Sequence, residues 1–234
     1  MSAILEIDGI SKDYRALRPL RVQHLSIAPG ESVAVLGLDR VAAEVLVNLV
    51  TGAALPDAGG IRVFGRATSA IADADDWLAT VDRFGIVSER AVLLEGLSVI
   101  QNLAMPFSLE IEPPPDEVRA RAAALAVEVG LPGSAGERRI SDLDASGRLR
   151  VRVGRAIALA PSLLLLEHAS AGLSGSDAAD AGRWIRGVAT RRGAAALAVT
   201  ADERFARAVA DRVLTLEPAS GRLREPGLRG WFRG

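Results

Sequence analysis

The sequence predicts an α/β fold in which a mostly parallel sheet is flanked by helices. Short apolar runs at 32–37 and 163–166 suit strands that are buried on both faces, and segments with a helical pattern alternate with such runs. This alternation is typical of a parallel sheet. The segments 3–27 and 98–160 depart from it, and they predict an antiparallel β subdomain and a small helical subdomain. With 234 residues, 49% of them hydrophobic, the chain can bury one substantial core.

The first half of the chain predicts strands that are bounded by turn residues. Alternation of apolar and polar residues indicates strands at 3–10 and 20–27, and the turn Pro29-Gly30 closes the second. The helical pattern that follows the buried run ends at Gly52. In chain order, the further elements predicted here are the strand 32–37, the helix 42–50, the turn 56–60, the strand 61–65 and the strand 81–87.

The second half predicts mainly helices, several of them bounded by proline. A short helix is stopped by Pro106, a stiff run of three prolines follows, and Asp116 is a plausible N-cap for the next helix. The strand 163–166 is the most apolar and is therefore expected to be the most central. Trp231 and Phe232 in the tail are expected to be exposed. The predicted elements are helices at 98–105, 116–129, 146–160, 176–192 and 203–210, and strands at 163–166, 194–200 and 212–216.

Composition excludes several classes of function. The net charge of -1 leaves no basic footprint, so nucleic acid is not an expected partner. The absence of cysteine excludes thiolate catalysis and thiolate metal sites, and two histidines make a dedicated zinc site improbable. The start of the chain has no secretory pattern, and the longest apolar stretch, 156–166, is broken by Pro161. We expect a soluble cytoplasmic protein, located peripherally at the inner face of a membrane if it binds a membrane partner.

The segment after the strand 32–37 has the context of a phosphate-binding P-loop. The consensus is Gly, four residues, Gly, Lys and then Ser or Thr, between a strand and a helix. Counted from Gly37, the last three places are Ala42, Ala43 and Glu44. The lysine that neutralises phosphate oxygens and the hydroxyl that holds magnesium are therefore both missing. Lys12 is the only lysine in the chain and lies before this strand.

The carboxylate of Glu44 is expected to weaken phosphate binding further, because it repels the phosphate charge. A carboxylate about 5 Å from one phosphate charge costs roughly 3 kcal/mol at an effective dielectric constant near 20. That is about two orders of magnitude in affinity. Glu44 is also expected near the positive helix N-terminus, where it would take the place of an anion.

Over nearly its whole length the chain resembles the ATP-binding subunits of ABC transporters. The resemblance rests on the common order and spacing of several segments, and it implies a P-loop NTPase-like fold in a single domain, 1–234, with a helical subdomain at about 90–160. It also implies ATP and Mg²⁺ as cofactors if the site is functional. The segments are Ser11-Lys12-Asp13-Tyr14, Pro29-Gly30-Glu31, Leu55-Pro56-Asp57-Ala58-Gly59-Gly60, Leu97-Ser98-Val99-Ile100-Gln101-Asn102-Leu103, Arg155-Ala156-Ile157-Ala158-Leu159-Ala160-Pro161, Ala171-Gly172-Leu173 and Ala210-Asp211-Arg212-Val213.

The departures from the family fall on its functional positions. Glu167 stands for the Walker B aspartate, His168 for the catalytic glutamate and Ala201 for the switch histidine, so no catalytic residue is assigned. Ser174 stands for the D-loop aspartate. The signature Leu-Ser-Gly-Gly reads Leu143, Asp144, Ala145 and Ser146. The equivalents of the nucleotide site are Tyr14, Gly37, Leu38, Asp39, Arg40, Val41, Ala42, Ala43, Glu44, Val45 and Ser88.

Structural explanations stand beside the functional ones. Tyr14 either stacks on adenine, as the resemblance implies, or covers the edge of the N-terminal sheet. His168 is either a general base or a partly buried polar residue. Glu167 either binds magnesium or is held by Arg155 or a backbone donor. Arg40 is a candidate substitute for the missing lysine.

Three functions remain open from the sequence. The first is a catalytically inactive ABC subunit, a pseudoenzyme with a structural or regulatory role. It would dock on a membrane permease through 88–105 and pair with an active ATPase subunit or with itself. The second is an ABC ATPase with weak or atypical hydrolysis that binds ATP through Tyr14, Arg40 and Glu167. The third is a free-standing interaction domain.

Overall fold

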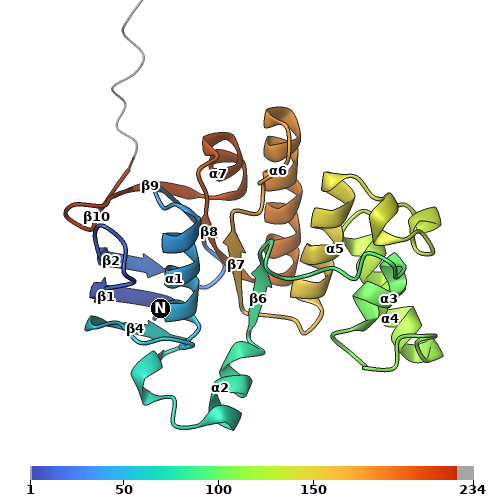
Figure 1. The fold of residues 1–234 in the computed structure, drawn as a ribbon, viewed down its shortest axis with the longest axis horizontal. Coiled ribbons are helices and arrows are strands. Elements are labelled where there is room, and N and C mark those ends of the chain that lie inside the picture. Colours follow the sequence, from blue (N-terminus) through green and yellow to red (C-terminus); the bar gives the residue numbers. More distant parts are fainter. Residues whose placement is uncertain (1, 226–234) are drawn as a thin grey trace, which may run out of the picture.

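The computed structural model describes residues 2–225 and contains two sheets, which confirm the predicted fold class (Figure 1). Trp231 and Phe232, predicted to be exposed, lie outside the described residues. The strands are β1 Leu5–Lys12, β2 Leu20–Ile27, β3 Ser32–Leu36, β4 Ala58–Val63, β5 Arg66–Ala67, β6 Phe84–Val87, β7 Leu163–Glu167, β8 Ala195–Val199, β9 Arg212–Glu217 and β10 Arg222–Arg224. The α-helices are α1 Arg40–Val50, α2 Ala74–Val81, α3 Val99–Ala104, α4 Asp116–Glu128, α5 Ala145–Ile157, α6 Gly175–Arg192 and α7 Glu203–Val209.

The larger sheet has the strand order β10-β9-β3-β8-β7-β6. Its strands run parallel except for β10, which pairs with β9 in antiparallel fashion. The smaller sheet, β2-β1-β4-β5, is antiparallel and forms the predicted β subdomain. The expectation that 163–166 is the most central strand is wrong, because β7 is second from the edge. The apolar run of β7 indicates that both faces of this strand are covered, but it does not indicate the place of the strand in the sheet order.

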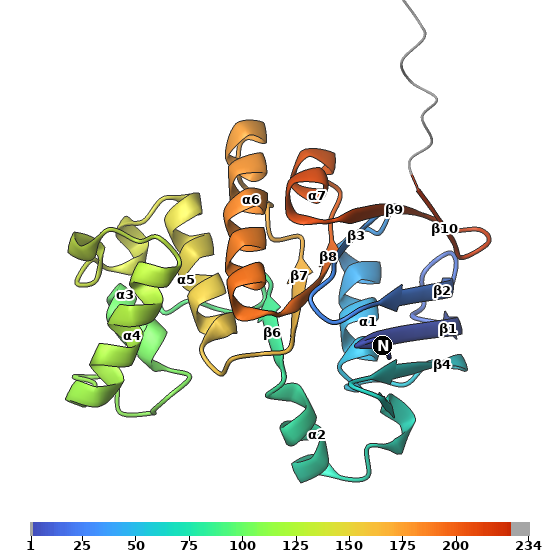
Figure 2. The same ribbon diagram turned by 180° about the vertical axis from the view of Figure 1, so that it is seen from behind.

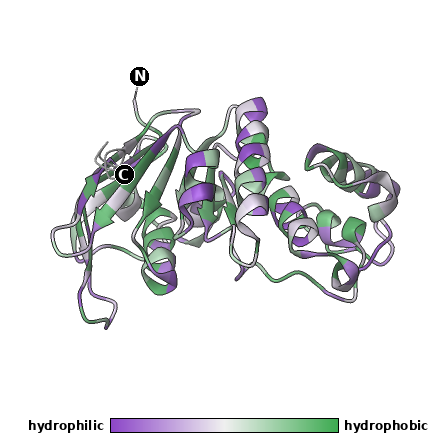
Figure 3. Cartoon of the chain, turned by 90° about the horizontal axis from the view of Figure 1, so that it is seen from above, coloured by the Kyte–Doolittle hydropathy of each residue, from purple (hydrophilic) through white to green (hydrophobic). Residues whose placement is uncertain are grey.

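Two hydrophobic clusters lie on opposite faces of the larger sheet, because successive side chains of a strand point to opposite sides. Val33 and Val35 of β3 face the cluster that α1 and the β subdomain share. Ala34 faces the other cluster, which contains residues of α3 to α7. Hydrophobic colour runs along the strands in Figure 3, whereas the helices carry alternating hydrophilic and hydrophobic bands.

Three helices form a group on one side of the larger sheet. In Figures 1 and 2, α3 and α4 lie beyond β6, and α5 lies between them and α6. We call α3, α4 and α5 the helical unit. Its connection from the sheet is the segment 88–98, between the end of β6 and the start of α3.

Several boundaries differ from the predictions because of local capping. Helix α1 begins at Arg40 and not at residue 42, because Asp39 is its N-cap. Asp116 is the first residue of α4 and not its cap, and no side chain caps that helix. Helix α2, capped by Asp73, was not predicted. It takes up Val81, so that the strand expected from residue 81 starts at Phe84.

Candidate functional site

The loop after β3 is closed by hydrogen bonds of its own. Gly37 has φ +93°, and a Cβ there would lie 2.9 Å from the carbonyl oxygen of Leu216, so the position requires glycine. Asp39 Oδ1 accepts from the N–H of Ala42 at 2.8 Å, and Asp39 O accepts from the N–H of Ala43 at 2.9 Å. The two amides at the Gly-Lys places of the consensus are thus already bonded. Asp39, and not Glu44 as expected, occupies the positive end of α1.

The residues around this loop divide between core and surface. Leu38, Ala42 and Ala43 are buried in the cluster that α1 shares with the β subdomain, and Val45 packs against it. Arg40 and Val41 are exposed. The guanidinium of Arg40 is paired with Glu89 at 3.0 Å. The position of the consensus lysine is therefore a buried methyl group.

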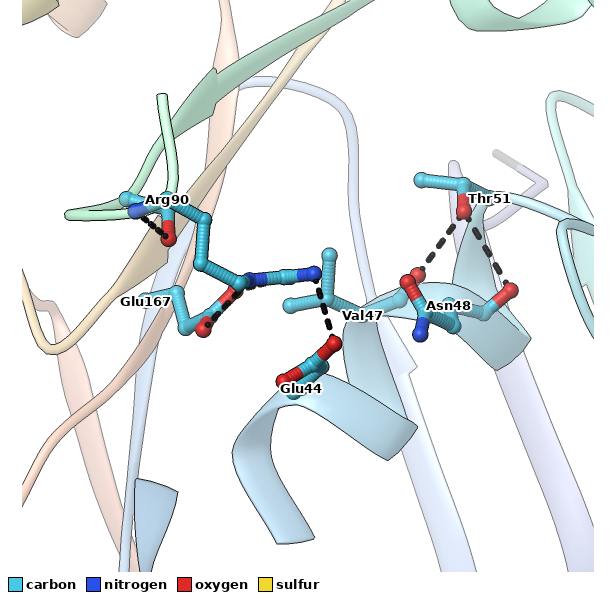
Figure 4. A network of polar contacts seen from close by, with 7 residues as sticks. Glu44, Val47, Asn48, Thr51, Arg90 and Glu167 are labelled. Carbon is cyan, nitrogen blue, oxygen red and sulfur yellow. Dashed lines mark hydrogen bonds and ion pairs between the residues drawn. The ribbon is translucent and has the colours of Figure 1, made fainter. Parts of the chain in front are cut away.

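Arg90 joins the two glutamates of the site (Figure 4). Its Nε donates to Glu167 Oε1 at 3.1 Å, its Nη2 donates to Glu167 Oε2, and its Nη1 donates to Glu44 Oε1 at 3.0 Å. The Glu167 side chain is only 8% exposed, against 43% for Arg90 and 44% for Glu44. The bond to Glu167 raises the pKa of Arg90 above its usual value. We call this arrangement the Arg90 bridge.

The suggestion that Arg155 holds Glu167 is wrong. Arg155 Nη1 donates instead to the carbonyl oxygen of Val92 at 2.7 Å. Arg90 was not among the candidate residues of the sequence. A signal for it existed, since Glu167 ends a buried strand and a buried carboxylate requires a donor, but the sequence does not reveal which arginine supplies it.

A cavity of about 190 Å³ surrounds the Arg90 bridge. It is lined by Arg40, Val41, Glu44, Ser88, Glu89, Arg90, Glu167 and His168. Its two arginines and three glutamates give these side chains a net charge of -1 with a neutral histidine. Within residues 2–225, no group of three or more His, Cys, Asp or Glu side chains is placed to hold a metal ion.

His168 has an unusual backbone conformation and a buried ring nitrogen. Its φ is +45°, in the left-handed region, and its Nε2 is buried without a hydrogen-bond partner among the described residues. Its backbone N–H donates to Val199 O at 2.8 Å. Ala201, at the switch-histidine position two residues beyond the end of β8, has no imidazole that could act as an acid or base.

Tyr14 lines a second, smaller cavity of about 90 Å³. Gly37, Leu38, Asp39 and Ala42 line it as well, so the start of α1 contributes to both cavities. Tyr14 is half-buried and packs against the core of the β subdomain. Burial, and secondarily the charge of Asp39, raise the pKa of Tyr14.

The signature-equivalent residues lie at the start of α5. Asp144 is the N-cap, and its Oδ1 accepts from the N–H of Gly147 at 2.7 Å. Leu143 is buried, whereas Ala145 is exposed and Ser146 is half-buried. None of these residues lines the cavity at the Arg90 bridge. Ser174 and Asp202 are likewise N-caps, of α6 and α7.

The sheet order, with a loop and helix after β3, defines the class of P-loop NTPase folds, and comparison with solved structures agrees. CbiO1 of Clostridium perfringens, described as part of an ABC transporter complex, superposes with a TM-score of 0.79 at 20% identity, covering 96% of this chain and 88% of that one. An ATP-binding cassette solved as a dimer with ADP and Pi gives a TM-score of 0.75 at 20% identity, covering 97% and 100%. No protein-family model matches the chain.

Sequence relatives give the family. The sulfate/thiosulfate import ATP-binding protein CysA 2 of Chromobacterium violaceum is 31% identical over 97% of this chain, which spans only 59% of that relative. The lipoprotein-releasing system ATP-binding protein LolD of Chromohalobacter salexigens is 30% identical over 95% of this chain and 93% of its own length. The chain belongs to the ATP-binding subunits of ABC transporters. Among residues 2–225, no helix is both long and apolar enough to cross a bilayer.

Proposed function

We propose that this chain is a catalytically inactive ABC subunit, with a structural or regulatory role beside a membrane permease or an active ATPase subunit. The observation that carries the proposal is the Arg90 bridge. It joins Glu44, at the Ser/Thr place of the P-loop consensus, to Glu167, at the Walker B place.

The Arg90 bridge argues against a magnesium–triphosphate complex at this place. Magnesium takes oxygen ligands, usually one or two carboxylates together with phosphates. Here the carboxylates at the two motif positions, Glu44 and Glu167, already share a guanidinium, so a metal ion bound between them would have to displace Arg90. The residues present do not fit the metal, and we derive no catalytic step through it.

The backbone also argues against triphosphate binding. Helix N-termini bind anions through N–H groups that have no partner within the helix. At α1, the side chain and carbonyl of Asp39 take the N–H groups of Ala42 and Ala43. At α5, Asp144 takes that of Gly147. A phosphate would have to compete with these groups and with the negative charge of both aspartates.

The alternative, weak ATP binding through Tyr14, Arg40 and Glu167, has less support. Two of these three side chains are already paired, Arg40 with Glu89 and Glu167 with Arg90. Tyr14 retains a cavity, but one of about 90 Å³, well below the 300 Å³ or so of a typical ligand pocket.

A groove between the sheet and α5 supports the permease as partner. It has a volume of about 260 Å³, and its lining includes Phe84, Ala91, Arg152, Arg155 and Leu159. Ala91 belongs to the expected docking segment 88–105. The lining carries two arginines, Arg152 and Arg155, against one acid, Asp82, and this excess of positive charge favours a partner segment that brings an acidic side chain. Docking on a permease would place the chain at the cytoplasmic face of a membrane.

The proposal is tested by assaying ATP hydrolysis in the purified chain. The wild type is expected to turn over no more ATP than the Glu167→Ala variant, and its melting temperature is expected not to rise with ATP and magnesium. Turnover that Glu167→Ala abolishes would overturn the proposal. Co-purification with a multi-span membrane protein would support the transport role over a free-standing interaction domain.

A further inference from the structure

We infer that two arginine clamps, at Arg90 and at Arg192, hold the helical unit in one orientation against the larger sheet without any ligand. This goes beyond the proposed function, because it concerns the relative motion of two parts of the chain and not nucleotide binding.

The first clamp acts on the segment 88–98, the connection from the sheet to the helical unit. The Arg90 bridge ties this segment to the end of β7 and to α1. A few residues later, the same segment is tied to the helical unit. Arg155 of α5 donates to Val92 O, and Asn102 of α3 accepts from Leu94 N at 2.9 Å and donates to Leu94 O at 3.1 Å. The connection is therefore bonded to the end of β7 and to α1 through Arg90, and to the helical unit through Val92 and Leu94.

The second clamp joins three helices through one guanidinium. Arg192, at the end of α6, donates through Nε and Nη2 to the two carboxylate oxygens of Glu128 on α4, at 2.7 and 2.6 Å. Its Nη1 donates to Ile157 O of α5 at 2.8 Å. The two side chains are only 23% and 26% exposed. Nearby, the guanidinium of Arg150 of α5 lies 4.7 Å from the ring centroid of Trp184 on α6.

The two clamps lie at opposite ends of the neighbouring parallel strands β7 and β8. Glu167 is the last residue of β7, whereas Arg192 shortly precedes the first residue of the parallel strand β8. A rigid body fastened at one point can pivot in any direction, whereas one fastened at two separated points can turn only about the line that joins them. The two clamps together therefore restrict the helical unit far more than either clamp alone. Both clamps are two-pronged arginine–carboxylate pairs, which fix orientation as well as distance.

The clamps have a consequence for the docking groove. Phe84 and Ile86 of the groove belong to β6, whereas Arg155 belongs to α5 and Leu159 follows it. If the helical unit cannot move, the groove keeps one width, and a partner finds it already formed without nucleotide. Domain closure around a ligand, a common switching motion, would be absent here.

Pulsed electron–electron double resonance, which measures the distribution of distances between two spin labels, tests the clamps directly. The chain has no native cysteine, so Val127→Cys on α4 and Thr215→Cys on β9, both exposed, give one label on each part. We expect one narrow distance distribution that does not change with ATP and magnesium. In the double variant Arg90→Gln/Glu128→Gln, we expect the distribution to broaden or to gain a second distance.

The matched control is Arg183→Gln/Arg207→Gln, which removes two arginines paired within their own helices. It is expected to keep the narrow distribution. A broad distribution in the labelled parent, or a narrow one in the clamp variant, would overturn the inference. If the clamp variant does not fold, hydrogen exchange of the unchanged protein decides the question. Slow exchange across 88–98 supports the clamps and fast exchange contradicts them. The comparison of parent, clamp variant and control and the hydrogen-exchange measurement are both made without nucleotide, so this inference and the proposed function can fail separately.

Discussion

A single arginine explains how this site tolerates two glutamates. Glu167 is almost fully buried, and a buried carboxylate is costly unless it is paired and hydrogen-bonded. Arg90 supplies two donors to Glu167 and a third to Glu44. Arg90 itself is nearly half exposed, so water can solvate it if the pair is broken.

This difference in burial predicts an asymmetric response to substitution. Arg90→Ala leaves a buried carboxylate without its partner and is expected to lower the free energy of unfolding by about 2 kcal/mol. Glu44→Ala removes only the exposed arm of the bridge and is expected to cost less than about 1 kcal/mol. Urea denaturation of the two variants measures both effects. Equal losses would show that burial of Glu167 does not govern the bridge.

The sequence revealed the acids of the site but not their counterion. Glu44 and Glu167 stand at motif positions and could be found by counting from Gly37 and along the strand 163–167. Arg90 lies 77 residues from Glu167 along the chain, and only the pairing of β6 with β7 brings the two together. Many other arginines were available, and Arg155 was a wrong choice because its side chain reaches Val92 instead.

At the scale of the elements, aspartate N-caps determine where the helices around the site begin. Because Asp39 is the N-cap, α1 begins two residues earlier than the apolar pattern predicted. The N–H groups of Ala42 and Ala43, at the Gly and Lys places of the consensus, therefore lie in its first turn. Strand β2 was predicted with its observed bounds, and the strongly apolar strands β3, β7 and β8 were predicted to within one residue at each end. Helix α2 contains no buried residue, so its pattern gave little signal.

The caps can be tested against a matched aspartate that does not cap. Asp39→Ala and Asp144→Ala each remove a side chain that accepts from a backbone N–H, and each is expected to cost about 1 kcal/mol. Asp116→Ala, at the first residue of α4 without such a bond, is expected to change stability by less than about 0.5 kcal/mol. Similar losses at all three positions in thermal denaturation would argue against the capping account.

The clamp between α4 and α6 predicts a dependence of stability on pH. The hydrogen bond from Arg192 lowers the pKa of Glu128 below its usual 4.5. A carboxyl whose pKa is lowered by folding stabilises the protein above its unfolded pKa, and this contribution is lost as the pH falls through the folded pKa. Glu128→Gln is therefore expected to cost about 1 kcal/mol at pH 7 and progressively less as the pH is lowered below 4.5.

Urea midpoints of the wild type and Glu128→Gln across that pH range provide the measurement. Glu137→Gln is the control, because its carboxylate is 72% exposed and its pairing with Arg119 should contribute little at any pH. A loss in Glu128→Gln that stays constant with pH would mean that the charge of Glu128 does not contribute to the clamp.

At the scale of the whole molecule, the fold and the site depend on different residues. Strand order and the two-sided core depend on the apolar patterns of the strands and helices. The site depends on a few side chains. Here Ala43 stands at the consensus place for a lysine, Glu44 at that for a hydroxyl and Glu167 at that for a metal-binding carboxylate, and Arg90 bridges the two glutamates. The architecture therefore does not decide the chemistry, because function resides in the site.

Calorimetric titration of the purified chain with ATP and magnesium tests the central claim most directly. We predict no saturable heat at micromolar concentrations, because a triphosphate would have to displace Arg90 from two carboxylates and compete with Asp39 for the amides of α1. A dissociation constant in the micromolar range would contradict the account.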